Sequence, residues 1–365
     1  MRFSKLLLAP ALALLTLTGC DPEEDIIIDP AADPANVYVV NEGNFNRGNG
    51  AISLFTKTSP LVVADLFRPV NGRGLGDVVQ SLTLANRRGY VVVNNSNKVE
   101  VVSLPDFRSV GVITGLRSPR YLLVISSTRA YVTQWGNFGN TRPGIKIVDL
   151  TTNTVIDSIA TGPQPERLLL AGGRVFVANS GSNTLSVIDP ATNRVSSTLT
   201  VGGAPNSLAL DATGRLWVLC GGTVAYTPTY DVDYAATTPG QLVSVTVGAA
   251  TPTISSARVF NTNRRQPVDL QLNGAGNQLF FRAVTASGTG PVFRLGPAEA
   301  ALPSLTGAPF IRRSLYGLGV DPRTDVIYGG TGTFLGTDRL IRYQPGGAAL
   351  DSVIVGAGPN GFVFN

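Results

Sequence analysis

Short apolar runs separated by turn residues dominate the pattern of this chain. Residues 165–203 read PERLLLAGGRVFVANSGSNTLSVIDPATNRVSSTLTVGG, with four runs rich in Val, Ile, Thr, Leu and Phe. Between the runs stand Gly172-Gly173, then Ser-Gly-Ser-Asn, then Asp-Pro-Ala-Thr-Asn. No run has the period of an amphipathic helix, and β-branched and aromatic residues favour strands. The segment therefore predicts four consecutive antiparallel strands joined by tight turns.

This quartet of strands recurs along the chain. Similar units open at Pro119, Pro165, Pro205 and Pro267, and the turn DLTTN at 149–153 matches DPATN in the 165–203 unit. A four-stranded sheet cannot bury its apolar face alone, and a repeat of about 40 residues is typical of β-propeller blades. A β-sandwich is the alternative, but it gives no reason for one quartet to recur.

The two ends of the repeat array predict how the ring closes. The first unit starts at NVYVVN (36–41) without an opening strand, whereas GPNGFVFN (358–365) matches PNSLAL and has no strand after it. The tail is expected to supply the missing strand and leave no open sheet edge. We therefore predict an all-β fold over 36–365: a seven-bladed β-propeller of four-stranded antiparallel blades, with the ring closed by the C-terminal strand. The blades are placed at 36–68 with 358–365, 77–114, 118–162, 164–203, 204–261, 266–308 and 314–356, with six or eight blades as alternatives.

The segment VFVANSGSNTLSVIDPATNRVSSTLTVGGAPNSLALD (175–211) resembles the YVTN-type β-propeller repeat, and AYVTQWG and VYVVNEGN are similar to it. The resemblance implies the propeller fold. It says little about function, because propellers serve as binding proteins, enzymes and scaffolds.

Residues 1–19 have the pattern of a secretory signal peptide. Arg2 and Lys5 precede an apolar run at 6–17 and small residues. Leu-Thr-Gly-Cys at 17–20 resembles the bacterial lipobox, and the resemblance implies cleavage before Cys20 and acylation of Cys20. An ordinary signal or a membrane anchor is the alternative, although the apolar run is too short to span a bilayer.

Residues 20–35 are expected to form an acidic, extended tether after the acylated Cys20. The sequence DPEEDIIIDPAADPAN combines an acidic run with three prolines that favour extended backbone. Surface lipoproteins of Bacteroidetes-type bacteria resemble this arrangement. The resemblance implies a lipid-anchored protein of the bacterial outer membrane, displayed on the cell surface.

Composition narrows the candidate chemistry. The chain has 29 Lys and Arg against 24 Asp and Glu, and the basic residues are scattered, which argues against nucleic acid as a partner. It has no His, which removes His-dependent triads, His metal sites and haem ligation by His. Cys220 is the one cysteine besides Cys20, so no internal disulfide is expected, and Cys220 is interpreted as a small buried residue.

The ligand site is expected on the face that carries the long loops after each second strand. Four carboxamides end second strands and are expected to ring the mouth of the channel: Asn41, Asn94, Gln134 and Asn179. Carboxamides both donate and accept, so such a ring suits a polyfunctional ligand. Hydrogen bonding of these amides to turn backbone is the alternative.

Aromatic and polar residues in the same loops complete the expected ligand-binding set. They are Glu42, Asn44, Phe45, Trp135, Asn137, Tyr226, Tyr230, Tyr234 and Phe334. Exposed aromatic side chains suggest coverage by a ligand or partner. Asp231 and Asp233 are too few to establish a calcium site, and Glu42 is interpreted as a hydrogen-bond acceptor because no second acid is in register.

The sequence favours a binding protein rather than an enzyme, with no cofactor and no metal. The NEGNF loop (41–45), the repeats and the acidic tether resemble surface lipoproteins that capture ligands for TonB-dependent outer-membrane transporters. The best-known of these propellers bind cobalamin, so the resemblance implies a small corrinoid ligand, a TonB-dependent transporter as partner, and membrane contact through lipid only. The alternatives are a propeller enzyme of the lactonase or quinone-dependent dehydrogenase type, and a scaffold that binds a protein or a glycan.

Anchoring through Cys20 gives a first testable prediction. Cys20→Ala removes the residue that the lipobox resemblance marks for acylation, so the protein should move from the membrane fraction to the soluble fraction while its circular dichroism stays unchanged. Fractionation with immunodetection measures this. A variant that still sediments with membranes would show that another segment holds the protein there.

Overall fold

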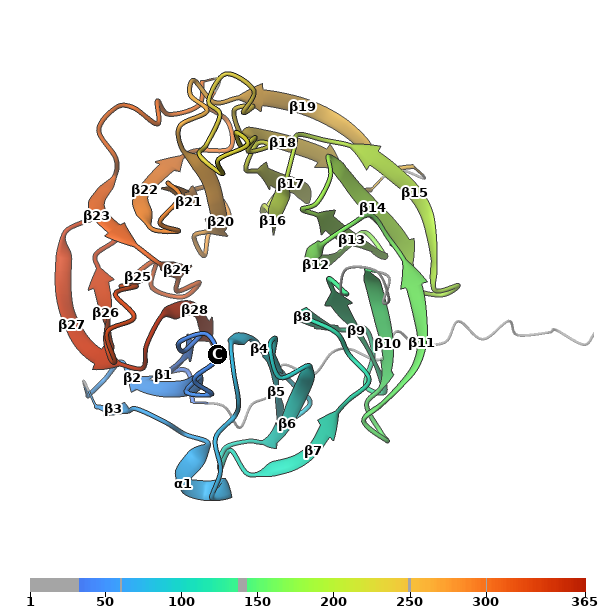
Figure 1. Cartoon of the computed structure of the whole chain (residues 1–365), viewed down its shortest axis with the longest axis vertical. Coiled ribbons are helices and arrows are strands. Elements are labelled where there is room, and N and C mark those ends of the chain that lie inside the picture. The colour runs from blue at the N-terminus through green and yellow to red at the C-terminus, as the bar shows by residue number, and fades with distance from the viewer. Residues whose placement is uncertain (1–32, 60, 137–142, 249–250, 300) are drawn as a thin grey trace, which may run out of the picture.

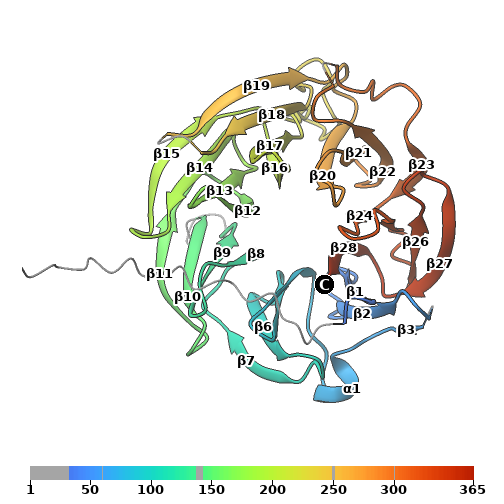
Figure 2. The same ribbon diagram turned by 180° about the vertical axis from the view of Figure 1, so that it is seen from behind.

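The computed structural model describes residues 33–59, 61–136, 143–248, 251–299 and 301–365. Seven four-stranded antiparallel sheets stand in a ring around a central channel, as Figures 1 and 2 show from opposite sides. The predicted seven-bladed propeller is confirmed. The expected signal peptide, Cys20 and most of the tether lie outside the described residues, as does Asn137.

Each blade runs from an inner strand at the channel to an outer strand at the rim. Blade one contains β28 (Pro359–Phe364), β1 (Asn36–Asn41), β2 (Ala51–Thr56) and β3 (Val62–Val63). Blade two contains β4 (Val79–Ala85), β5 (Arg88–Val93), β6 (Lys98–Ser103) and β7 (Ser109–Ile113). Blade three contains β8 (Pro119–Val124), β9 (Arg129–Gln134), β10 (Gly144–Asp149) and β11 (Thr154–Ala160). Blade four contains β12 (Pro165–Ala171), β13 (Arg174–Asn179), β14 (Thr184–Asp189) and β15 (Arg194–Thr200).

The second half of the ring follows the same plan. Blade five contains β16 (Pro205–Leu210), β17 (Arg215–Cys220), β18 (Gln241–Thr246) and β19 (Thr253–Val259). Blade six contains β20 (Gln266–Leu272), β21 (Leu279–Val284), β22 (Gly290–Leu295) and β23 (Ile311–Leu315). Blade seven contains β24 (Gly317–Val320), β25 (Ile327–Gly330), β26 (Asp338–Tyr343) and β27 (Ala349–Val355).

One short helix, α1 (Arg68–Asn71), links blades one and two. Across the described ranges, no helix has the length and apolar character needed to cross a bilayer.

The hydrophobic core lies between blades rather than inside a single layer. Seven apolar clusters each combine side chains from two adjacent blades, including one shared by blades seven and one. Central strands are therefore buried on both faces, and β13 reads as the continuous apolar run VFVA rather than as an alternating strand. The outer strand β15 alternates, because only one of its faces meets protein.

The C-terminal strand closes the ring as predicted. β28 pairs antiparallel with β1, with Val37 opposite Phe364 and Val39 opposite Phe362. Both phenylalanine rings also pack on Tyr328 of blade seven, at centroid distances of 5.9 Å for Phe362 and 5.0 Å for Phe364. The strand thus belongs to blade one and contributes to the contact with blade seven.

The predicted boundary of blade six at residue 308 is wrong. Its outer strand β23 lies at Ile311–Leu315, and only Tyr316 separates it from the inner strand of blade seven. The residues that the prediction placed at the end of this blade belong to a loop whose Leu305 is buried in the core between blades five and six. Pro297, Pro303 and Pro309 interrupt that loop, and proline cannot donate to a strand ladder.

The inner strands begin with an unusual backbone geometry that shapes the channel. In five blades the residue before the inner strand has positive φ, with values between 46° and 61° at Val78, Ser118, Gln164, Ala204 and Gly358. Shortly after it, the register with the second strand shifts, as between Pro165 and Leu168 in β12. A bulge of this kind re-aims side chains. Two successive residues of an inner strand, such as Glu166 and Arg167, therefore line the channel.

Ring closure gives the second prediction. Deletion of residues 359–365 removes β28, exposes the edge of β1 that β28 covers and uncovers Tyr328, so the protein should aggregate or melt at a much lower temperature. Deletion of Asn365 alone, which lies after β28, is the matched control and should leave the melting temperature nearly unchanged. Thermal unfolding followed by circular dichroism measures both. Equal melting temperatures for the two truncations would contradict the closing role of β28.

Candidate functional site in the central channel

The candidate site is a cavity of about 430 Å³ in the central channel, on the face where the inner strands begin. Its polar wall is formed largely by residues near the start of six of the seven inner strands: Gln80, Arg120, Glu166, Arg167, Asn206, Asp269 and Asn360. Second strands and interblade segments add Glu42, Arg282 and Tyr316. A cavity of this volume is typical of sites for small ligands.

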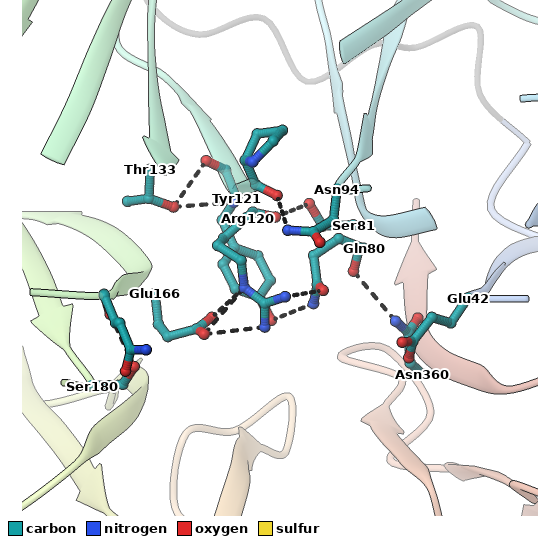
Figure 3. Close-up of polar contacts among 12 residues, drawn as sticks. Glu42, Gln80, Ser81, Asn94, Arg120, Tyr121, Thr133, Glu166, Ser180 and Asn360 are labelled. Atoms are coloured by element: carbon teal, nitrogen blue, oxygen red, sulfur yellow. Dashed lines mark hydrogen bonds and ion pairs between the residues drawn. The ribbon is translucent and has the colours of Figure 1, made fainter. Parts of the chain in front are cut away.

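An ion pair between blades three and four forms one wall (Figure 3). The Nε of Arg120 donates to both carboxylate oxygens of Glu166 at 3.1 and 3.2 Å, and its Nη2 lies 3.0 Å from Oε1. Its Nη1 donates to Oε1 of Gln80 in blade two, and the Gln80 amide donates to the Tyr121 hydroxyl at 3.2 Å. Burial raises the pKa of Glu166, and the guanidinium of Arg120 opposes that rise.

A second ion pair lies within blade six. Nε and Nη2 of Arg282 donate to Oδ2 of Asp269 at 2.8 and 2.6 Å, and Nη1 donates to the backbone carbonyls of Gly288 and Leu315. Asp269 has a φ of 57°, which turns its carboxylate toward this arginine at the channel wall. All three guanidinium nitrogens of Arg282 are therefore engaged by the protein.

Glu42 lies at the junction of blades one and seven and accepts a hydrogen bond from the Tyr316 hydroxyl. Burial raises the pKa of Glu42, although Tyr316 and Arg120 oppose that shift. Burial and the nearby Glu42 charge also raise the pKa of Tyr316. The Tyr316 ring packs edge-on against Phe334 at 5.0 Å, and the Asn44 amide donates to the Phe334 carbonyl at 2.7 Å. The structure thus gathers the predicted residues Glu42, Asn44 and Phe334 around Tyr316.

The four carboxamides that end second strands are mostly turned into their own blades. Asn41 donates to Val39 and Ala51 carbonyls and to Ser53, while Asn179 donates to Thr184 and Ser186. Gln134 accepts from the Arg117 backbone, and Asn94 donates to the Pro119 carbonyl. Asn41, Gln134 and Asn179 are buried, so the expected ring of amides at the mouth is not formed by these side chains. They satisfy turn groups, which was the alternative interpretation.

The predicted aromatic residues have different positions. Trp135 stacks on the Arg120 guanidinium at 4.2 Å, and its buried indole Nε1 has no hydrogen-bond partner within the described residues. Phe45 is 69% exposed, and Tyr230 is 88% exposed at the tip of the 221–240 loop. Tyr226 and Tyr234 belong to the same loop, and neither lines the channel cavity.

Asp231 and Asp233 are used inside their own loop. Asp231 accepts from Thr229, and Asp233 accepts from the backbone of Ala235 and Ala236. In the part of the chain that the structure describes, no group of three or more Asp, Glu, His and Cys side chains is arranged to hold a metal ion. Cys220 is buried, and burial raises the pKa of its thiol to about 12.

Sequence reasoning missed most of the channel wall, although a signal for it exists. In several blades the wall residue directly follows the proline that opens the inner strand, as in Pro-Arg120, Pro-Glu166, Pro-Asn206 and Pro-Asn360. Polar residues at one fixed position of a repeat that is otherwise apolar mark a shared solvent-facing site. The amides that end the second strands are more conspicuous in the sequence than these wall residues, because they lie beside the long loops.

A family model described as "Domain of unknown function (DUF5074)" matches residues 35–259, which is more than half of the chain, so the protein belongs to this family. PE-PGRS family protein PE_PGRS18 of Mycobacterium tuberculosis is 51% identical over 39 residues. That match covers 11% of this chain and 8% of the relative, so the chain spans only a small part of the relative's length.

Solved structures share the fold at low identity. A periplasmic gluconolactonase of Pseudomonas aeruginosa has a TM-score of 0.64 at 14% identity and covers 90% of this chain and 98% of its own. A provisionally named 6-phosphogluconolactonase of Bacteroides fragilis has a TM-score of 0.64 at 11% identity, with coverage of 92% and 100%. A quinonprotein alcohol dehydrogenase-like protein of Bacteroides thetaiotaomicron has a TM-score of 0.64 at 13% identity, with coverage of 91% and 78%.

The expectation that the protein is not an enzyme is contradicted. Proteins named as lactonases are among its structural neighbours, so this architecture accommodates catalysis. The expectation that no second acid accompanies Glu42 is also wrong. Glu42, Glu166 and Asp269 all line the cavity, and their positions after turns and bulges hid their convergence.

The interblade ion pair gives the third prediction. Arg120→Met leaves the Glu166 carboxylate buried without its guanidinium, which should cost about 3–5 kcal/mol of unfolding free energy at neutral pH. Because burial then holds the Glu166 pKa above its unfolded value, the deficit should shrink as pH falls through the ordinary carboxyl range. Chemical denaturation at neutral and mildly acidic pH measures both effects.

Two variants accompany this test. Arg120→Met combined with Glu166→Gln should recover much of the lost stability, because no buried charge remains. Arg108→Met disrupts an exposed pair with Asp106 at 3.7 Å and should cost little, because water screens such a pair. A deficit for Arg120→Met that is as small as that of Arg108→Met, or independent of pH, would contradict the account of the pair.

Proposed function

We propose that this protein is a binding propeller whose central channel takes up a small, hydroxyl-rich ligand of the sugar-acid or sugar-lactone class. The observation that carries the proposal is the convergence of carboxamides, arginines and carboxylates from most blades on one cavity of about 430 Å³. Oδ1 of Asn360 on this wall has no hydrogen-bond partner within the described residues, and neither has Nε1 of Trp135, which packs on the wall residue Arg120. Hydroxyl groups, which both donate and accept, match such a wall.

The names of the neighbouring structures support the ligand class, since two of them are called lactonases. Glu42 and Tyr316 form a hydrogen-bonded acid–base pair at the cavity, which favours hydrolysis of a cyclic ester as a second candidate function. In that reaction water adds to the ester carbonyl, the ring C–O bond breaks and a hydroxy acid forms. Turnover and binding can therefore be measured on one panel of compounds.

Capture of a corrinoid for a TonB-dependent transporter is the finer proposal, and it is supported by the resemblance of the NEGNF loop and the tether. A corrinoid is too large to enter a cavity of about 430 Å³, so it would lie across the mouth. Exposed Phe45 on that face would be available to a flat ligand. Acylation of Cys20 and display on the outer membrane complete this proposal and account for a transporter as partner.

The fourth prediction tests the channel directly. Full-length protein purified in detergent is titrated by calorimetry with gluconate, galacturonate, glucono-δ-lactone and cyanocobalamin, and the lactone sample is assayed for acid release. Asn360→Ala removes a polar partner from the cavity wall, and Trp135→Ala removes the ring that stacks on the wall residue Arg120. Each change should weaken binding of the sugar compounds by roughly tenfold to a hundredfold.

The matched control is Asn153→Gly, in a short turn on the opposite face. Asn153 has a φ of 56°, which glycine adopts readily, so this change should leave binding unaltered. Binding of cyanocobalamin alone, with no effect of Asn360→Ala, would favour the mouth over the channel. Loss of binding in Asn153→Gly but not in Asn360→Ala would place the site on the opposite face of the ring.

A further inference from the structure

The arginines of the channel differ in how much of their hydrogen-bonding capacity is already used. Arg120 donates to Glu166 and Gln80, and Arg282 donates to Asp269 and to backbone carbonyls. A guanidinium has five N–H groups in a fixed planar fork. The donors of these two residues are committed to the protein, so they shape the wall more than they offer free contacts.

Arg167 is different. It lines the same cavity beside Glu166, yet no carboxylate or carbonyl within the described residues accepts from its guanidinium. The guanidinium lies 4.1 Å from the centre of the Tyr121 ring, which holds its plane at the cavity wall. Arg167 therefore presents an oriented donor fork to the channel, of the kind that binds carboxylates in a bidentate manner.

Glu42 is the carboxylate of the cavity that has no cation in hydrogen-bond contact among the described residues. It stands at the junction of blades one and seven, whereas β12, which carries Arg167, lies across the channel from β28 and β24 in Figure 1. Tyr316 and Asn360 face Glu42 as hydrogen-bonding groups, Arg120 as a nearby positive charge and Asp77 as a nearby negative charge. Figure 3 shows Glu42 and Asn360 side by side and away from the Arg120–Glu166 pair.

From this arrangement we propose that the channel ligand is a hydroxylated monoanion whose carboxylate binds Arg167 and whose hydroxyl end reaches Glu42 and Tyr316, with uptake of one proton by Glu42 on binding. The inference rests on the proposed channel function and specifies the charge of its ligand. It makes Arg167 the residue that distinguishes an acid from the matching neutral polyol.

The charges of the cavity wall explain why Glu42 should take up a proton when an anion binds. The Arg120–Glu166 and Arg282–Asp269 pairs are internally neutral, which leaves Arg167 and Glu42 as the remaining opposite charges. An anion that neutralises Arg167 also adds a negative charge to the cavity of Glu42, where solvent screening is weak. Burial already favours the neutral carboxyl of Glu42, so a proton from solvent restores the balance. A neutral Glu42 can donate to a ligand oxygen, which an ionised one cannot.

The fifth prediction compares matched pairs of probes by calorimetry on the full-length protein in detergent. Gluconate is compared with sorbitol, and galacturonate with galactose, so that each pair differs mainly in the carboxylate. The acids should bind at least tenfold more tightly than the neutral compounds, and more weakly as pH rises. Repeating the titrations in buffers of different ionisation enthalpy should reveal net proton uptake on binding of the acids.

Three variants locate the two charges. Arg167→Gln should weaken acid binding by about tenfold to a hundredfold. It should lower the melting temperature only slightly, because it loses the stack on Tyr121 but no hydrogen bond within the described residues. Glu42→Gln should abolish the proton uptake and flatten the pH dependence, and it retains an acceptor for Tyr316. Arg117→Gln removes the same charge from an exposed position outside the channel and should leave binding unchanged.

The failures of the two proposals are distinguishable. If sorbitol binds as tightly as gluconate, if Arg167→Gln binds the acids normally, or if protons are released rather than taken up, this inference is wrong while channel binding stands. Proton release would indicate a ligand with its own cationic group beside an ionised Glu42. If neither the acids nor the neutral compounds bind, the proposed function is wrong as well.

Discussion

Contact between neighbouring blades is the constraint on which this molecule depends. Each of the seven apolar clusters belongs to two blades, so among the residues that the structure describes no blade has a core of its own. A linear stack of such sheets would leave two apolar faces in water, and the ring removes both. The closing strand β28 completes the sheet of blade one by pairing with β1. It also covers the apolar face of blade seven, because its phenylalanines pack on Tyr328.

Polar and charged residues that the apolar contacts between blades exclude are gathered along the central channel. Its polar wall is built largely from residues near the start of the inner strands, whereas the central strands are filled with buried apolar residues. Arg120, Glu166 and Gln80 come from three successive blades and hold one another across two interfaces. Such a network links the geometry of the site to the packing of the ring, so the site is positioned by the whole fold rather than by one loop.

Much of the fold could be predicted from the sequence because turns and apolar runs are local signals. The Gly172-Gly173 break and the DPATN turn mark strand ends, and the match between the tail and PNSLAL predicts the closing strand. The outer strand of blade six was misplaced because the predicted end of that blade, residue 308, lies in a loop whose Leu302 and Leu305 pack in the core. An apolar residue in the sequence predicts that its side chain is buried, but it does not predict whether that residue lies in a strand or in a loop.

The site was harder to predict for a geometric reason. A strand period of two places successive side chains on opposite faces, whereas the bulge in β12 brings Glu166 and Arg167 to one cavity. Gln164, directly before β12, has positive φ and contributes to this bulge. Because it is not a glycine, the sequence gives no indication of that backbone conformation. Conversely, Asn41 and Asn179 were expected at the mouth because strand ends approach the loops, but hydrogen bonds to serines turn them inward. The sequence analysis named Glu42 and Phe334, but it did not name Tyr316, which contacts both of them.

The position of β28 in chain order has a consequence for biosynthesis. All other strands leave the ribosome before β28, and β1 must wait for a partner that is made last. Asn360, which lies on β28, also completes the channel wall. A nascent or truncated chain therefore has neither a closed ring nor a finished site.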